Sequence, residues 1–269
     1  MGHYVVVEPG VKIYVEELGS GKPVVLIHGW PVNCKMFEYQ TNILPKHGYR
    51  CISIDLRGYG RSDAPWDGYN YDRMADDIYE VIKSLNLECD ATLVGFSMGG
   101  GIAVRYMSRY KGYKINKLLL CGAAAPSFVQ RPGFPYGMTT EAVQQFIAGA
   151  YTDRPQLLTQ FGNMFFHKPV TPAFSDWFRS LGFDASSHGT IGGLEALRDE
   201  DLRNDLTQIA TPTYIFHGIH DQVCPFPLAI AMHQAITGSI LLRFDESGHG
   251  LFYDELDTFN ARLLDVLRF

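Results

Sequence analysis

The sequence predicts an α/β protein in which helices cover both faces of a mostly parallel, eight-stranded sheet. Short apolar runs alternate with longer amphipathic segments along the chain, and the connections between them are short. The middle runs are almost entirely apolar, which is typical of parallel strands that are buried on both faces. Because 46% of the 269 residues are hydrophobic, the chain can also bury a large core.

Eight apolar runs form the predicted strands. Pro9 and Gly10 separate the first two runs, and a Pro-Gly turn between β-rich segments is typical of a hairpin. We therefore expect this opening pair to be antiparallel. In chain order the predicted strands are 4–8, 12–16, 24–27, 51–54, 91–94, 118–121, 213–216 and 240–244.

Four segments between these runs carry apolar residues at the spacing of an amphipathic helix. In the first of them, Met74, Ile78 and Val81 share one face and charged residues occupy the other. The predicted helices span 71–85, 100–110, 228–236 and 256–267.

Residues 126–206 interrupt this alternation. They contain no predicted strand but many aromatic residues, and a structureless loop of that length is rare within a compact domain. We therefore expect a helical cap insert over 126–206, with 1–125 and 207–269 forming the core. Most of the aromatic residues are expected to pack within the insert, while a few line an apolar pocket that faces the sheet.

Composition and charge exclude several classes of protein. The 23 basic and 29 acidic residues give a net charge of −6 without charged blocks, which argues against nucleic-acid binding and a polybasic membrane anchor. No stretch approaches the ~20 apolar residues that span a membrane. The five cysteines form no CxxC pair, and the N-terminus lacks a secretory pattern, so we expect free thiols and a cytoplasmic location.

The sharpest local signal is Gly95-Phe96-Ser97-Met98-Gly99, which lies between a predicted strand and a predicted helix. A G-x-S-x-G motif in this position is typical of a nucleophile elbow. The turn holds the Ser97 hydroxyl clear of the backbone, and the helix that follows directs its N-terminal amides towards developing negative charge. We therefore expect Ser97 to be a catalytic nucleophile.

A serine nucleophile needs a base, and His249 is the strongest candidate. It is flanked by Gly248 and Gly250 just after the last predicted strand, and the expected chain order is serine, acid, histidine. The competing histidines downstream of Ser97 lie beside the preceding strand, in a predicted helix or in the insert: His217, His220, His233, His167 and His188.

Asp221 is the strongest candidate for the acid that orients His249. It follows the strand 213–216 at its carboxyl end, where open α/β sheets place residues that face a ligand. There it would accept the second ring proton of the histidine. Competing carboxylates form a solvated face or a helix start, or are close to His249 only in sequence: Asp199, Glu200, Asp201, Asp205, Asp245 and Glu246.

The oxyanion of an acyl-transfer transition state needs fixed hydrogen-bond donors. We expect these donors to be the backbone amides of Met98 and Trp30, with Gly29 clearing space beside the nucleophile. The Trp30 indole either packs or shapes the acyl pocket. His28 is expected to hydrogen-bond to backbone and hold the loop rather than to act as a base.

Five motifs taken together resemble the α/β-hydrolase superfamily, and within it the non-haem haloperoxidases (perhydrolases) and the aryl or carboxylesterases. The resemblance extends from about residue 10 to 267. The motifs lie, in the family's order, at 28–31, 55–62, 95–100, 217–225 and 248–250.

The resemblance implies a Ser-His-Asp enzyme that needs no metal or cofactor and hydrolyses small carboxylic esters, with perhydrolysis by peroxide as a side activity. By position, the resemblance places Ala124, Phe128 and Val223 in the substrate pocket beside Trp30, although core packing would explain them equally well. It also implies an internal ion pair between residues 55 and 57.

Other functions remain open on the same residues. The triad also fits a carbon–carbon bond hydrolase, a lactonase, an amidase, a hydroxynitrile lyase or a non-enzymatic ligand receptor. Serine at position 97 argues against haloalkane dehalogenase and epoxide hydrolase chemistry, in which the nucleophile is an aspartate. The sequence leaves self-association open.

Overall fold

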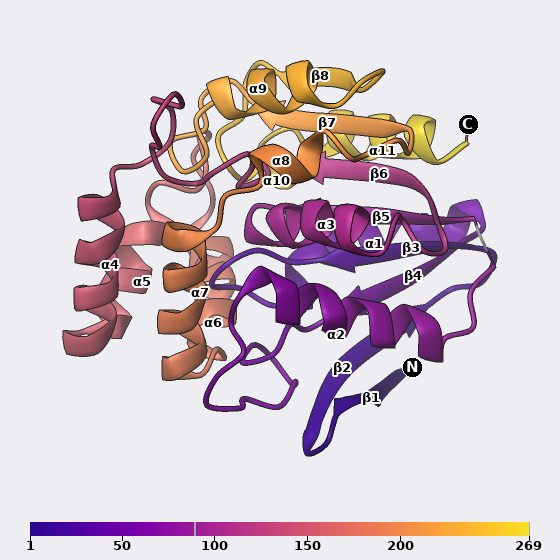
Figure 1. The fold of residues 1–269 in the computed structure, drawn as a ribbon, viewed down its shortest axis with the longest axis horizontal. Helices are drawn as coiled ribbons and strands as arrows, with labels where there is room; N and C mark the ends of the chain where they lie inside the picture. Colours follow the sequence, from indigo (N-terminus) through magenta and orange to yellow (C-terminus); the bar gives the residue numbers. More distant parts are fainter. Residues whose placement is uncertain (89, 269) are drawn as a thin grey trace.

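The computed structural model describes residues 1–88 and 90–268, and within them the chain forms an eight-stranded sheet (Figure 1). The strand order is β1-β2-β4-β3-β5-β6-β7-β8. The strands are β1 (Gly2–Glu8), β2 (Val11–Leu18), β3 (Lys22–Ile27), β4 (Tyr49–Ile54), β5 (Ala91–Phe96), β6 (Ile115–Cys121), β7 (Thr213–Gly218) and β8 (Ile240–Phe244).

Strand direction follows the predicted pattern. The β1–β2 hairpin and the β2–β4 pair are antiparallel, and every pairing from β4 to β8 is parallel. Val25 of β3 is paired with Ile52 on one side and Leu93 on the other, and β5 is buried along its whole length. Burial on both faces explains why these strands read as continuous apolar runs. The mostly parallel eight-stranded sheet and the antiparallel opening pair are both confirmed.

Helices cover both faces of the sheet. In Figure 1, α2, α3 and α9 lie on the near face, whereas α11 lies behind the sheet. On that far side, Gln40 of α1 donates a hydrogen bond to Asn260 of α11 (3.0 Å). The four predicted helices are confirmed. The helices outside 126–206 are η1 (Cys34–Phe37), α1 (Glu38–Thr41), η2 (Leu44–His47), α2 (Tyr71–Ser84), α3 (Met98–Arg109), α9 (Pro227–Ala235), α10 (Leu251–Asp254) and α11 (Leu256–Arg268).

The segment between β6 and β7 is helical, and only isolated bridges interrupt it within the fully described range 126–206. Figure 1 shows α4 to α7 grouped beside one end of the sheet. Trp30, which follows β3, donates its indole N–H to the Thr190 carbonyl of α7 (2.9 Å), so these helices stand at the carboxyl ends of the strands. They are α4 (Thr140–Thr152), α5 (Arg154–Gly162), α6 (Pro172–Phe183), α7 (Ser187–Asp199) and α8 (Arg203–Leu206).

The expected ion pair between Asp55 and Arg57 is wrong. The Asp55 carboxylate instead accepts backbone N–H groups, including that of Arg61 (2.9 Å). The fully buried Arg57 guanidinium binds Asp77 of α2 (2.6 Å) and Glu8 of β1 (2.8 Å). The physical reason is that Asp55 is already satisfied by the loop around it, while the Arg57 side chain is long enough to reach α2.

Two further expectations concern thiols and membranes. The four cysteines within the described residues are free and buried, as predicted, and Cys89 lies outside the described residues. In the part of the chain that the structure describes, no helix has the length and apolar character to cross a bilayer.

Candidate active site

Ser97 occupies the turn that joins β5 to α3, with φ 52° and ψ −120°. A positive φ is uncommon for a residue with a Cβ and marks local strain that the surrounding structure must hold in place. The tight packing of this turn requires small neighbours: a Cβ on Gly95 would lie 2.5 Å from the Gly99 carbonyl oxygen. The local geometry of a nucleophile elbow is therefore present at Ser97.

His249 lies in the loop between β8 and α10, and its Nδ1–H donates a hydrogen bond to Oδ2 of Asp221 (2.8 Å). Both side chains are completely buried. This bond assigns the ring proton to Nδ1 and leaves Nε2 with a lone pair that can accept a proton. Nε2 is itself buried and has no hydrogen-bond partner in residues 1–88 and 90–268. The imidazole is therefore held by Asp221 with Nε2 as the nitrogen able to accept a proton.

Asp221 is held as a carboxylate by four contacts. Its Oδ1 accepts the backbone N–H groups of Val223 and Cys224 (both 2.8 Å), and its Oδ2 lies 2.8 Å from His249 and 3.4 Å from Nε2 of His217. Burial alone would raise the pKa of Asp221, but the charges and hydrogen bonds of His249 and His217 outweigh it and hold this pKa below the usual range. The carboxylate is thus ionised at neutral pH.

The structure brings Ser97 and His249 into the same buried region, but it forms no hydrogen bond between the Ser97 hydroxyl and Nε2 among the described residues. The neighbouring Phe96 ring lies 4.8 Å from the His249 ring. Hydrogen bonds of this kind are often long before substrate binds and shorten in the complex. Of the three predicted residues, Asp221 and His249 are joined directly, whereas Ser97 is linked to them only through its chain neighbour Phe96, whose ring contacts His249.

His217 is a buried neighbour of the pair that the sequence indicates only as a competing base. Besides its approach to Asp221, its Nε2 lies 2.7 Å from the Cys224 carbonyl oxygen. The available signal was its position four residues before Asp221, at the end of the same strand. The ring therefore sits on the carboxylate side of the site, where it stabilises the negative charge.

The other competing histidines are engaged elsewhere. His220 stacks on His167 with ring centroids 3.9 Å apart, and the Nε2 of His188 lies 3.0 Å from the Ala64 carbonyl oxygen. His233 pairs through Nδ1 with Ser239 (2.9 Å).

Five of the six competing acids form ion pairs, and the sixth, Glu246, is exposed and forms none within 4.0 Å in the described chain. Arg105 of α3 binds both Glu200 (3.1 Å) and Asp205 (3.0 Å). Both carboxylates are half-buried, whereas the sequence predicted a solvated face or a helix start. Asp205 does lie in the first turn of α8, in agreement with a helix start. The remaining pairs are Asp199 with Arg198, Asp201 with Arg203 and Asp245 with Arg243.

The loop after β3 approaches the nucleophile closely. A Cβ on Gly29 would lie 2.8 Å from the Ser97 Cβ, so only glycine permits this approach. Burial lowers the pKa of His28, and the neutral ring accepts the Leu56 N–H (3.0 Å) through Nε2 while Nδ1 lies 2.9 Å from the Gly29 carbonyl oxygen. The expectation that His28 holds the loop through backbone hydrogen bonds is confirmed.

The backbone amides of Met98 and Trp30 were expected to donate hydrogen bonds to the oxyanion beside Ser97. Met98 is the first residue of α3, so its N–H has no intrahelical acceptor. The Trp30 amide belongs to the loop that Gly29 brings against Ser97. The Trp30 indole is buried, bonds to α7 and packs edge-on against Phe161 with centroids 4.8 Å apart.

The expected pocket residues Ala124, Phe128 and Val223 are all buried. Ala124 N–H donates to the Ser97 carbonyl oxygen (2.9 Å), which places its backbone beside the elbow. Phe165, for which the sequence indicated no role, has its ring centroid 4.9 Å from that of His249. A small, mostly apolar cavity of about 20 Å³ opens beside it and is lined by Pro31, Val32, Leu158, Phe161, Gly162, Phe165, Phe178, Arg179 and Gly182.

The fold and this site define the class of protein. The sequence model of the alpha/beta hydrolase fold matches residues 22–256, and the chain belongs to this family of hydrolases. The solved structure of an esterase from Exiguobacterium antarcticum is 52% identical, with a TM-score of 0.98 and complete coverage of both chains.

Two curated relatives agree with this placement. A non-heme chloroperoxidase of Kitasatospora aureofaciens is 33% identical over 96% of each chain. A bifunctional esterase/perhydrolase of Acinetobacter calcoaceticus is 30% identical over 98% of this chain and 99% of its own. The resemblance to the haloperoxidase and esterase branch is thereby confirmed.

Proposed function

We propose that this hydrolase cleaves small carboxylic esters through an acyl-enzyme intermediate, with Ser97 as nucleophile, His249 as general base and Asp221 as the orienting acid. The observation that carries the proposal is the Asp221–His249 hydrogen bond, which leaves the buried Nε2 without a partner among residues 1–88 and 90–268. The ring of Phe96, next in the chain to the strained Ser97, lies against this imidazole. The esterase similarity at 52% identity supports ester hydrolysis as the reaction.

In the proposed reaction, Nε2 of His249 takes the Ser97 proton as the hydroxyl oxygen attacks the ester carbonyl carbon. The backbone N–H groups of Trp30 and Met98 stabilise the resulting oxyanion. His249 then gives its proton to the leaving alcohol, and a water molecule releases the acid from Ser97 in the reverse sequence. Asp221 stabilises the imidazolium throughout, and these steps use no cofactor.

We further propose that residues 126–206 form a cap over the site and that 1–125 and 207–269 form the catalytic core. The hydrogen bond from Trp30 to Thr190 and the contact of Phe165 with His249 support this assignment. Ala124, Phe128, Val223 and Trp30 would line the pocket.

The small cavity beside Phe165, whose ring contacts His249, supports a preference for short acyl groups, although Ser97 is not among its lining residues in the described chain. A cavity of about 20 Å³ holds little more than one water molecule. Substrate entry therefore requires displacement of side chains, and the displacement grows with acyl length. Among p-nitrophenyl esters we expect kcat/KM to be highest for acetate and to fall as the chain lengthens.

The test is Ser97→Ala, assayed with p-nitrophenyl acetate. The variant should fold normally and lose at least about a hundredfold in kcat, since it lacks the nucleophile. Ser84→Ala, at the exposed end of α2, is the matched control and should retain wild-type activity. A phosphonate probe should label the wild type and Ser84→Ala once and leave Ser97→Ala unlabelled. Retention of more than about a hundredth of the activity would overturn the assignment.

Perhydrolysis is the second activity we propose, because relatives include a bifunctional esterase/perhydrolase and a non-heme chloroperoxidase. Hydrogen peroxide in place of water would release a peracid from the acyl-enzyme. Failure to form peracetic acid from acetate and peroxide would remove this activity and leave ester hydrolysis intact. Lactones, amides and carbon–carbon substrates in the same panel separate the other triad reactions.

Location and partners are also proposals. Free, buried thiols support a reducing, cytoplasmic compartment. The net charge of −6 supports a small-molecule substrate rather than nucleic acid.

A further inference from the structure

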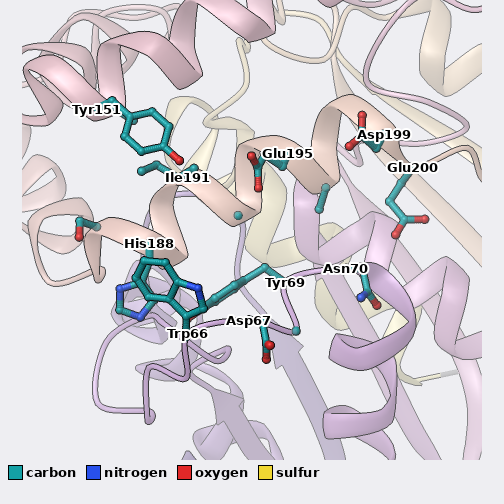
Figure 2. A pocket seen from close by; sticks show the side chains of 15 residues that line it. Trp66, Asp67, Tyr69, Asn70, Tyr151, His188, Ile191, Glu195, Asp199 and Glu200 are labelled. Carbon is teal, nitrogen blue, oxygen red and sulfur yellow. The ribbon is translucent and has the colours of Figure 1, made fainter.

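A cavity of about 570 Å³ lies on the outer side of α7 (Figure 2). Its walls come from α7, from the end of α4 and from the loop 66–70 before α2. Ser97, Asp221 and His249 are not among the lining residues within the described chain. The opposite side of α7 faces Trp30, because a Cβ on Gly193 would lie 2.8 Å from the indole Cδ1. One helix therefore separates this groove from the proposed catalytic residues.

Two aromatic side chains that line this groove are largely exposed to solvent. Trp66 is 83% exposed and Tyr151 is 71% exposed. The Trp66 ring lies 5.5 Å from His188 at an interplanar angle of 30°, and Tyr69 meets His188 edge-on at 6.0 Å. Figure 2 shows Trp66 and His188 overlapping at the left of the groove, Tyr151 above them, and Asp199 and Glu200 at the right. Exposed aromatic surface gathered in a concave site is typical of ligand binding.

The groove also carries unbalanced negative charge. It is lined by Asp67, Glu195, Asp199 and Glu200, and the described lining residues include no lysine or arginine. Asp199 and Glu200 have arginine partners outside the groove. Asp67 and Glu195 are exposed and form no ion pair within 4.0 Å in the described chain. Figure 2 shows Glu195 projecting from α7, to the right of the Tyr151 and Trp66 rings.

We propose that this groove binds a small organic cation, an ammonium group that carries methyl or aryl substituents. Faces of Trp and Tyr rings attract such cations through the ring quadrupole, and a nearby carboxylate adds a Coulombic attraction. Anionic ligands would be repelled by the same carboxylates. A bare metal ion fits poorly, because no group of three or more ligating side chains is arranged to hold one anywhere in residues 1–88 and 90–268.

The test is calorimetric titration of the intact protein with choline and with its neutral isostere, 3,3-dimethyl-1-butanol. Choline should bind saturably with an affinity at least about threefold above that of the isostere, and benzyltrimethylammonium should bind more tightly than choline. Added salt should weaken choline binding and leave the isostere unchanged. The readout is binding, so it does not depend on the proposed ester hydrolysis.

Variants locate the site. Trp66→Ala and Glu195→Gln should each weaken choline binding by about three- to thirtyfold. Both side chains are exposed, so the fold should be retained, and esterase activity should be unchanged. The matched controls are Tyr136→Ala and Asp257→Asn, an exposed aromatic residue and an exposed carboxylate outside the groove, which should bind choline like the wild type.

Three results would overturn the proposal. Equal affinity for choline and the isostere would show that the groove binds apolar surface and does not recognise the positive charge. Wild-type choline binding by both groove variants would place the cation elsewhere. Absence of saturable binding, together with a mass in solution that falls on Trp66→Ala substitution, would assign the groove to a second copy of the chain.

Discussion

Replacing Gly29 by alanine tests the close approach of the β3 loop to the nucleophile. The added Cβ would lie 2.8 Å from the Ser97 Cβ and 3.0 Å from Cδ1 of Phe96. Ordinary contacts begin at 3.4 Å, so the loop and the elbow must separate by about 0.6 Å. The backbone amide of Trp30, next in the chain, is displaced with the loop.

The expected cost falls on catalysis more than on folding. A displacement of about 1 Å in a catalytic constellation can cost ~100-fold in rate, so 0.6 Å should lower kcat by about ten- to a hundredfold. Overpacking of this kind costs about 1–3 kcal/mol of stability. Because the proposed oxyanion contact is made mainly in the transition state, KM should change by less than about threefold.

The assay is p-nitrophenyl acetate hydrolysis, with urea unfolding measured in parallel. Gly149→Ala is the control, because a Cβ at this position in α4 would make only ordinary contacts, the nearest with Leu157 at 3.7 Å. It should match the wild type in kcat and in stability to within about 1 kcal/mol. Wild-type kcat in Gly29→Ala would refute the placement of the donor loop against Ser97.

Three other perturbations test the buried electrostatics. Asp221→Asn removes the acceptor that fixes the His249 tautomer, so kcat should fall by about 10³- to 10⁴-fold, and a loss below tenfold would contradict the orienting role. Asp77→Asn leaves the buried Arg57 short of its closest carboxylate and should lower the free energy of unfolding by about 3 kcal/mol, whereas Asp265→Asn, which breaks exposed ion pairs, should lower it by no more than about 0.5 kcal/mol. Burial raises the pKa of four thiols in the folded chain, so the unfolded chain loses these protons first as the pH rises. Urea unfolding between pH 8 and 10 should therefore show stability falling by about 1.4 kcal/mol per thiol for each pH unit above ~8.5, and a flat profile would contradict it. The thiols are those of Cys34, Cys51, Cys121 and Cys224.

The sequence was most informative where the chemistry is local. The elbow at Ser97 is contained in the short run Gly95-Phe96-Ser97-Met98-Gly99, because the turn, its small neighbours and the start of the following helix are adjacent in the chain. The strands of the parallel sheet were equally predictable, since burial on both faces requires a continuous run of apolar residues in the sequence. Asp221 and His249 could be selected because each follows a strand at its carboxyl end.

Contacts between distant segments were not predictable in this way. Arg57 binds Asp77 and Glu8 because three segments meet in space, and the sequence instead suggested the nearby Asp55. Phe165 resembled any other aromatic residue of its segment, yet its ring lies against His249. Side-chain partners of this kind depend on how helices pack, which no local pattern records.

The hydrogen bond from the Trp30 indole to α7 affects which substitutions this protein can accept during evolution. The acceptor is the main-chain carbonyl of residue 190, so the hydrogen bond does not require the chemistry of a particular side chain at that position. Side chains on the helices of the proposed cap can thus be exchanged without releasing the loop that carries the proposed oxyanion donor. At this contact, evolution or design can therefore change which substrates are accepted without disturbing the loop proposed to take part in the reaction.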